Sequence, residues 1–214
     1  MLSNKLFKIL FVISLVLLII TLSFKLYIFN FDLYQKGFIK YNIYEKIPDA
    51  DKNALNLINF MNNKEELNDF YNEDEKLHLQ DVKELYKNLN LIFYITLILT
   101  ILLLIYFIYN KNFKMIYSSF LISSLILFII ILMFFVFDFN YLFEKFHEIV
   151  FRNDLWQLNP DKDNLINLFP EQIQYNITKK IFANVLFSAI ILSILGLIIR
   201  FKVIKRFLNK SIFL

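Results

Sequence analysis

The sequence contains no cysteine, and this absence removes several classes of function at once. A chain without cysteine has no disulfide framework, no thiolate metal site and no cysteine nucleophile. It also has no cysteine that could carry a lipid, so we expect that the protein is not itself a lipoprotein. Glycine is nearly as scarce, with 2 residues among 214, so close helix packing through GxxxG motifs is not expected.

Charge is nearly absent from four long stretches, which predict membrane-spanning helices. Hydrophobic residues make up 58% of the chain, and the charged residues gather between the apolar stretches. Each stretch is long enough to cross about 30 Å of hydrocarbon at about 1.5 Å per residue, and a helix satisfies its own backbone hydrogen bonds in lipid. The polar–apolar alternation of a transmembrane β-strand is absent. The predicted spans cover approximately residues 6–30, 89–109, 115–137 and 181–199.

Acidic residues are missing from three short segments, namely the N-terminus, the turn between spans two and three, and the C-terminal tail. Their basic residues are Lys5, Lys8, Lys111, Lys114, Arg200, Lys202, Lys205, Arg206 and Lys210. The positive-inside rule places all three segments in the cytoplasm, and orientation explains the basic tail better than lipid-specific binding does. The first apolar run is too long for a signal peptide and lacks a cleavage site, so we expect a retained anchor.

All 19 acidic residues then fall in two outer loops, approximately 31–88 and 138–180. The fold class predicted is therefore all-α: a four-helix transmembrane bundle with two helical extracytoplasmic loops and with both termini cytoplasmic. We expect a single integral membrane domain over residues 1–214, located in the cytoplasmic (plasma) membrane.

The first outer loop shows two helical patterns. Asp51 is the candidate cap of a helix with Leu55, Ile58 and Met61 at a spacing of three. A second helix opens with Asn72 and the acidic residues 73–75, which suit the helix dipole, and it is expected to continue straight into span two. His78 and Asp81 lie on one face of that helix, about one turn apart.

The second outer loop begins with a helical stripe of aromatic residues that has His147 on its flank. The only tryptophan, Trp156, follows at a position typical of an interfacial anchor. Residues 161–171 then predict a short amphipathic element that stops at Pro170.

Histidine titrates near neutral pH, so the two histidines are the first candidates for an acid or a base. The alternative is that each is a packed or solvated loop residue. A metal site made of His78, Asp81, His147 and Asp154 is a third possibility, although a spacing of three arises easily by chance in an acidic helix.

Serine is absent from both outer loops, and Thr178 is their only hydroxyl residue apart from tyrosine. A Ser-His-Asp hydrolase would therefore lack its nucleophile, which favours a reaction in which the substrate supplies the attacking group. Glycine-rich phosphate loops and nucleic-acid motifs are absent as well.

Three motifs resemble those of the lipoprotein intramolecular transacylases, a family of small four-span membrane proteins. The first is Asn72-Glu73-x-Glu75-x-x-His78-x-x-Asp81-Val82-Lys83. The second is Phe146-His147 followed by Phe151-x-Asn153-Asp154-x-Trp156-x-Leu158-Asn159-Pro160, and the third is Asp163-x-Leu165-Ile166-x-Leu168-Phe169-Pro170-Glu171. The four-span layout and the chain length agree too.

The resemblance implies an enzyme that moves the sn-2 acyl chain of a diacylglyceryl lipoprotein onto its N-terminal cysteine amine. It implies that His78 and His147 form the catalytic pair. Asp81 is a candidate to orient His78, although a group one turn away or a basic residue is the better expected partner of Asp81, and Glu73 or Glu75 is the alternative. Asp154 and Trp156 are expected to support the site. The expected partners are lipoproteins and membrane lipid, with no cofactor, metal or nucleic acid, while the oligomeric state is left open.

Two alternatives compete with this enzyme. One is a non-catalytic sensor or assembly protein whose outer loops bind a lipid or an exported partner. The other is a metal-dependent hydrolase at the outer face. The distance between the two histidine rings separates these hypotheses, because a catalytic pair requires the rings to converge.

Overall fold

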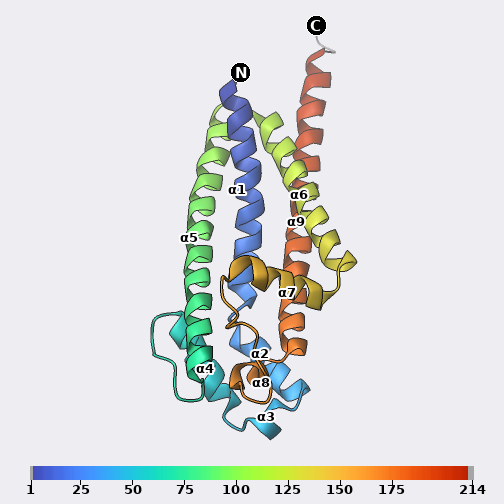
Figure 1. The fold of residues 1–214 in the computed structure, drawn as a ribbon. Coiled ribbons are helices and arrows are strands. Elements are labelled where there is room, and N and C mark those ends of the chain that lie inside the picture. Colours follow the sequence, from blue (N-terminus) through green and yellow to red (C-terminus); the bar gives the residue numbers. More distant parts are fainter. Residues whose placement is uncertain (1, 212–214) are drawn as a thin grey trace. The chain divides into compact units, whose positions relative to one another are not determined.

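The computed structural model describes residues 2–211, and the side chains of residues 4–205. Residues 1 and 212–214, at the two ends of the predicted domain, lie outside this described part. The side chains of Arg206 and Lys210 lie outside it as well. Helices form all of its regular secondary structure, and it contains no β-strand (Figure 1). The helices are α1 (Leu2–Tyr27), α2 (Phe31–Lys40), α3 (Ile43–Lys46), α4 (Ala50–Met61), α5 (Glu73–Tyr109), α6 (Phe113–Val136), α7 (Phe139–Val150), α8 (Asn164–Leu168) and α9 (Glu171–Ser211).

Within residues 2–211, four helices are long and apolar enough to cross a membrane, which confirms the predicted number of spans. They lie within Asn4–Tyr27, Glu73–Tyr109, Phe113–Val136 and Glu171–Lys205. The second and fourth are longer than a bilayer requires, and their charged first turns precede the apolar stretches 89–109 and 181–199. We therefore place residues 73–88 of α5 and 171–180 of α9 outside the membrane-spanning segments.

The end of the first span differs from the prediction. Helix α1 ends at Tyr27 and not near residue 30, although Ile28 and Phe29 continue the apolar run. Asn30 instead begins α2, because its side-chain oxygen accepts a hydrogen bond from the Leu33 amide at 3.3 Å. A local capping bond thus starts a new helix at a point where the sequence is still apolar.

The chain divides into two compact units. The first contains residues up to 23, residues 90–136 and residues from 182 onward, and the second contains residues 24–89 and 137–181. The first unit thus holds the apolar helical segments, and the second holds the connecting segments together with the charged starts of α5 and α9.

Within the first unit, small hydroxyl side chains link the apolar helices. Thr100 donates a hydrogen bond to Ser14 at 3.0 Å, and Ser124 and Ser193 share a hydrogen bond. Gly196 marks one close approach, because a Cβ atom there would lie 3.0 Å from Leu121 Cγ. Small polar residues of this kind favour close helix contacts in lipid, where apolar burial gives little driving force.

The second unit has a conventional hydrophobic core that includes Tyr34, Phe38, Phe60, Tyr71 and Leu168. These side chains come from α2, α4, α8 and the segment before α5, and all of them are buried. Burial of large apolar side chains gives each about 1.5–3 kcal/mol of stabilisation. The segments between the spans therefore fold against one another as a packed domain.

Two local predictions in this unit were wrong in detail. Helix α4 begins at Ala50 after Asp49, so Asp51 is not its cap and instead accepts hydrogen bonds from Gln35 at 2.9 Å and Tyr44 at 2.7 Å. Its buried face includes Leu57 and Met61, whereas Leu55 is exposed. The element predicted over residues 161–171 is limited to α8, because the preceding residues form turns around Asn159.

Candidate functional site

The first turn of α5 is fixed by a reciprocal pair of hydrogen bonds. The Asn72 amide donates to Glu75 Oε2 at 2.7 Å, and the Glu75 amide donates to Asn72 Oδ1 at 2.9 Å. This is a capping box, in which two side chains satisfy backbone donors that the helix itself leaves free. It sets where α5 starts, and thereby the direction in which His78 points one turn later.

Glu75 also connects α5 to α8. Its other carboxylate oxygen, Oε1, accepts a short hydrogen bond from the Leu165 amide at the start of α8. The side chain is fully buried, and burial raises the pKa of this carboxyl against the opposing effect of the backbone hydrogen bonds from Leu165 and Asn72. The hydrogen bond from Asn164 Nδ2 to the Phe70 carbonyl, at 2.6 Å, also joins α8 to the residues just before α5.

His78 follows on the next turn of α5 and is 6% exposed. Its Nδ1 atom is buried and has no hydrogen-bond partner among the described residues. Burial lowers the pKa of His78 from 6.5 to about 4, the nearby His147 acts in the same direction, and Asp81 acts against both. The ring is therefore a neutral imidazole at neutral pH.

His147 lies near the end of α7, which Asp138 caps by accepting a hydrogen bond from the Asn140 amide at 2.9 Å. Its Nδ1 atom is 2.6 Å from the Phe143 carbonyl oxygen, one turn earlier. Because a carbonyl oxygen only accepts, this contact assigns the proton to Nδ1. Burial lowers the pKa of His147, so the neutral ring carries a lone pair on Nε2.

The two histidine rings converge. Their centroids are 6.5 Å apart, and the Phe151 ring lies 5.2 Å from His78 and 5.6 Å from His147. Trp156 packs 5.1 Å from His147 at an interplanar angle of 31°. Aromatic side chains thus enclose both imidazoles and keep them poorly hydrated, which strengthens electrostatic effects on any group placed between them.

The acidic residues predicted to orient His78 bind elsewhere. Asp81 accepts a hydrogen bond from Asn153 at 2.9 Å, Glu73 pairs with Lys76 at 3.0 Å, and Glu75 holds the backbone amides described above. Asp154 accepts a hydrogen bond from Gln157 at 3.2 Å. The structure therefore brings His78, His147 and Trp156 together, and gives these four carboxylates structural partners.

The proposed metal set does not assemble in the described part of the chain. No group of three or more histidine, aspartate and glutamate side chains gathers there closely enough to hold an ion. Asp81 and Asp154 are occupied by amide donors, so the hypothesis of a two-histidine carboxylate site has no support from their geometry.

Sequence reasoning missed two features of the site. Phe151 is part of the second motif, but local spacing does not show that its ring will lie beside both histidines. The Glu75–Leu165 hydrogen bond was missed for the same reason. The Asn72-x-x-Glu75 spacing did carry a usable signal, since an acidic residue three positions after a capping residue is typical of a capping box.

Comparisons with known proteins agree with this architecture. The chain matches the family described as lipoprotein intramolecular transacylase Lit over residues 9–173. A solved structure of the lipoprotein intramolecular transacylase Lit from Bacillus cereus superposes with a TM-score of 0.76 and 22% identity, covering 96% of this chain and 98% of that one.

Two variants of the Bacillus cereus protein, in which one histidine is replaced by arginine or by alanine, each superpose with a TM-score of 0.75 and 20% identity. They cover 94% and 96% of their own chains and 96% of this one. No curated protein matches the sequence. At this level of identity the likeness to the solved structures shows a shared fold.

Proposed function

Because the chain belongs to the lipoprotein intramolecular transacylase family, we propose that it moves the sn-2 acyl chain of a diacylglyceryl lipoprotein onto the lipoprotein's own N-terminal amine. The product would be a lipoprotein with an N-acylated cysteine and a lyso-glyceryl group. The observation that carries the proposal is the convergence of His78 and His147, 6.5 Å apart and enclosed by aromatic rings.

The substrate contains both reacting groups, so the enzyme needs no nucleophile of its own. The amine nitrogen attacks the sn-2 ester carbonyl and forms an N–C bond, and the bond from that carbon to the glycerol oxygen breaks. The nitrogen loses a proton and the glycerol oxygen gains one, so protons balance without a cofactor. Holding amine and ester together makes the attack effectively unimolecular, which gives a large part of the rate enhancement.

His147 is suited to the role of base. Its Nδ1–H is committed to the Phe143 carbonyl, so Nε2 is left with a lone pair to receive the proton of the attacking amine. The carbonyl also stabilises the imidazolium that forms, because it keeps accepting the same hydrogen bond. Acid–base catalysis by a positioned group of this kind typically contributes about 10²–10⁴-fold.

His78 is suited to act at the glycerol oxygen or the oxyanion. It is neutral at neutral pH, and its buried Nδ1 has no partner in the described part of the structure. An unpartnered buried nitrogen has a free-energy cost that a substrate hydrogen bond would remove. A hydrogen bond from this ring to the developing alkoxide or oxyanion would supply that bond.

The acyl chains need a path from lipid, and α7 offers one. Phe143 and Phe146 contact the His147 ring at centroid distances of 4.1 and 5.3 Å, and both are also substantially exposed. Ile149 on the same helix is 82% exposed. An apolar face that reaches from a histidine to the molecular surface suits an amphipathic helix at the lipid interface.

The site is assigned to the extracytoplasmic side of the cytoplasmic membrane. The support for this part of the proposal is the distribution of charge, since the N-terminus, the turn at residues 110–112 and the C-terminal tail hold basic residues and no acidic ones.

The test is expression in a bacterial host that lacks other lipoprotein N-acylation. Mass spectrometry of lipoprotein N-termini should show the N-acyl lyso form with the wild-type protein and with the exposed control variant Lys52→Ala. His78→Ala and His147→Ala should each lower the yield by a factor of about 10² or more, the lower range for loss of an acid or base, with unchanged membrane insertion.

A non-catalytic sensor or assembly protein remains the alternative class. Full acyl transfer by the double variant His78→Ala/His147→Ala would exclude the catalytic pair. Diacyl lipoproteins that stay unmodified in cells producing wild-type protein would exclude the enzyme altogether.

A further inference from the structure

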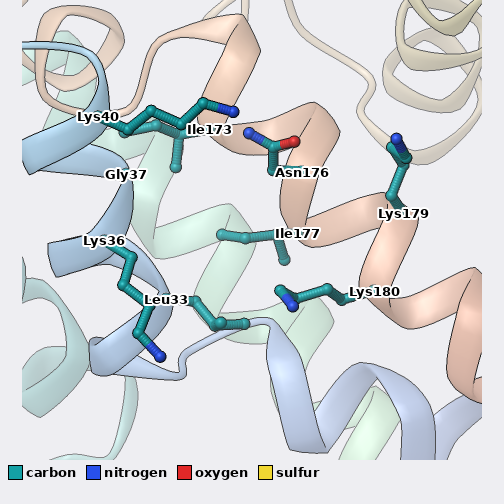
Figure 2. Close-up of a pocket in the computed structure, with 9 residues that line it drawn as sticks. All are labelled: Leu33, Lys36, Gly37, Lys40, Ile173, Asn176, Ile177, Lys179 and Lys180. Atoms are coloured by element: carbon teal, nitrogen blue, oxygen red, sulfur yellow. The ribbon is translucent and has the colours of Figure 1, made fainter.

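A second site candidate lies between α2 and the first turns of α9. It is a cavity of about 320 Å³, and its lining shares no residue with the aromatic enclosure of the histidine pair. Four of its lining residues are lysines, namely Lys36, Lys40, Lys179 and Lys180. Figure 2 shows the α2 lysines on one wall and the α9 lysines on the other.

The walls are two helix faces with the same spacing. Helix α2 contributes residues 33, 36, 37 and 40, and α9 contributes residues 173, 176, 177 and 180. This i, i+3, i+4, i+7 pattern gives each helix a continuous face toward the cavity. Gly37 allows the helices to approach closely, because a Cβ atom there would lie 2.9 Å from two Ile173 side-chain atoms.

The protein leaves the charge of this cavity uncompensated. No acidic residue lines it, and none of the four lysines forms an ion pair with a carboxylate among the described residues. Lys40 and Lys179 lie over the rings of Tyr41 and Tyr175, at 5.1 and 5.4 Å, which is a weak substitute for a counter-ion. Lys36 and Lys40 are one turn apart and repel each other, so a bound anion would stabilise them.

The positions of the lysines along the chain indicate that the anion belongs to a membrane lipid. Lys179 and Lys180 directly precede the apolar stretch 181–199 of α9, and α2 begins four residues after Tyr27, the last residue of the apolar helix α1. The lysines therefore lie where lipid headgroups meet hydrocarbon. Among the apolar residues of the lining, Ile173 and Ile177 are buried in the core and Leu33 is partly exposed, so Leu33 offers apolar surface on which the upper acyl chain of a lipid can pack.

We propose that this cavity binds the phosphodiester headgroup of an anionic phospholipid. Basic pockets beside transmembrane helices recognise such headgroups through the same combination of ammonium groups and adjacent apolar surface. This site is independent of acyl transfer, so its test does not depend on the catalytic proposal.

The experiment is native mass spectrometry of the full-length protein in detergent, titrated with phosphatidylglycerol or phosphatidylcholine. The wild type should retain phosphatidylglycerol adducts in preference to phosphatidylcholine adducts. A lysine near an anionic lipid surface strengthens binding roughly fivefold, so each Lys→Gln change in the cavity should weaken phosphatidylglycerol binding by about that factor. The fourfold variant Lys36→Gln/Lys40→Gln/Lys179→Gln/Lys180→Gln should lose the preference.

A matched control has the same loss of charge elsewhere. The fourfold variant Lys46→Gln/Lys52→Gln/Lys64→Gln/Lys162→Gln changes exposed lysines outside the cavity and should keep the preference. Lys→Arg at the four cavity positions should also keep it, because the charge is retained.

Two results would overturn the proposal. One is equal phosphatidylglycerol binding by the wild type and the cavity Lys→Gln variant. The other is displacement of the lipid by inorganic phosphate at a similar concentration, since that would identify a free-anion site without lipid recognition. Circular dichroism of each variant shows that lost binding does not reflect lost folding.

Discussion

At the scale of single residues, the histidine pair owes its chemistry to its surroundings. An exposed histidine is partly protonated near neutral pH, whereas burial lowers the pKa values of both His78 and His147. A neutral imidazole already has one unprotonated nitrogen, so it can accept a proton from a substrate without first releasing a proton to water. Under the proposed function, the aromatic rings of Phe151 and Trp156 therefore assist proton transfer by helping to keep the imidazoles buried, although neither ring titrates.

The lowered pKa values predict a pH dependence of stability. The unfolded chain protonates its histidines below about pH 6.5, whereas folded His78 stays neutral down to about pH 4. The unfolded state thus binds more protons across this window, so the free energy of unfolding should fall as the pH falls from about 6.5 to about 4. Thermal unfolding in detergent at a series of pH values measures the slope.

The variant His78→Gln is the matched control for that measurement. It should unfold with a smaller pH dependence in the same window, because it lacks the buried ring that resists protonation. Identical slopes for the two proteins would show that His78 titrates normally. Nitrogen NMR of histidine-labelled protein gives an independent check, since the chain has 2 histidines and both should be mainly neutral at pH 7.

At the scale of elements, Glu75 connects the start of α5 to the start of α8. One carboxylate oxygen accepts the Asn72 amide and the other accepts the Leu165 amide. Glutamine has a single side-chain oxygen, so Glu75→Gln would leave one buried backbone donor facing an amide NH₂. We expect the free energy of unfolding to fall by about 1–3 kcal/mol, the usual cost of an unsatisfied buried donor.

Hydrogen exchange localises that effect. The Leu165 amide and its neighbours in α8 should exchange faster in Glu75→Gln than in the wild type. The control is Glu73→Gln, which changes an exposed carboxylate that pairs with Lys76 and should cost no more than about 1 kcal/mol. Unchanged protection of α8 in Glu75→Gln would contradict the assigned connection.

Some of these elements and their boundaries could be predicted from the sequence, and others could not. The spans were predictable because a charge-free run of about 20 residues has few alternatives to a membrane helix. The capped start of α5 was predictable because its signals lie within four residues. The end of α1 at Tyr27 was not, since the Asn30 capping bond competes with a continuing apolar run.

For the site, the sequence indicated the two histidines as candidate residues but did not show that their rings lie close together. His78 and His147 lie on different helices, and their proposed pairing came from the family resemblance and not from spacing. The Phe151 ring beside both of them, and the amide partners of Asp81 and Asp154, are tertiary contacts. No local pattern specifies such contacts, so the sequence did not show that Asp81 and Asp154 would accept hydrogen bonds from Asn153 and Gln157.

At the scale of the whole molecule, the absence of cysteine makes the proposed orientation directly testable. Single cysteines can be placed at exposed positions in a chain that has no background thiol. In intact cells a membrane-impermeant maleimide should label Lys64→Cys and Lys162→Cys, which lie in the segments assigned to the outside. Asn110→Cys, in the turn between α5 and α6, should react only after the membrane is permeabilised.

The opposite labelling pattern would place the histidine pair on the cytoplasmic side. That result would separate the pair from exported lipoproteins and would contradict the proposed function, even though the family assignment would stand. Wild-type protein, which has no thiol, is the control for non-specific labelling.

Helix α5 is continuous over 37 residues, and His78 precedes the apolar stretch that begins at Leu89 on the same helix. The rise of an α-helix puts His78 roughly 16 Å along the axis from Leu89. A continuous helix of fixed length thus connects the ring of His78 to the segment that responds to hydrophobic mismatch. Under the proposed function, the thickness of the bilayer would set the height at which this ring meets the ester carbonyl, so lipid composition would tune the reaction without contacting the site.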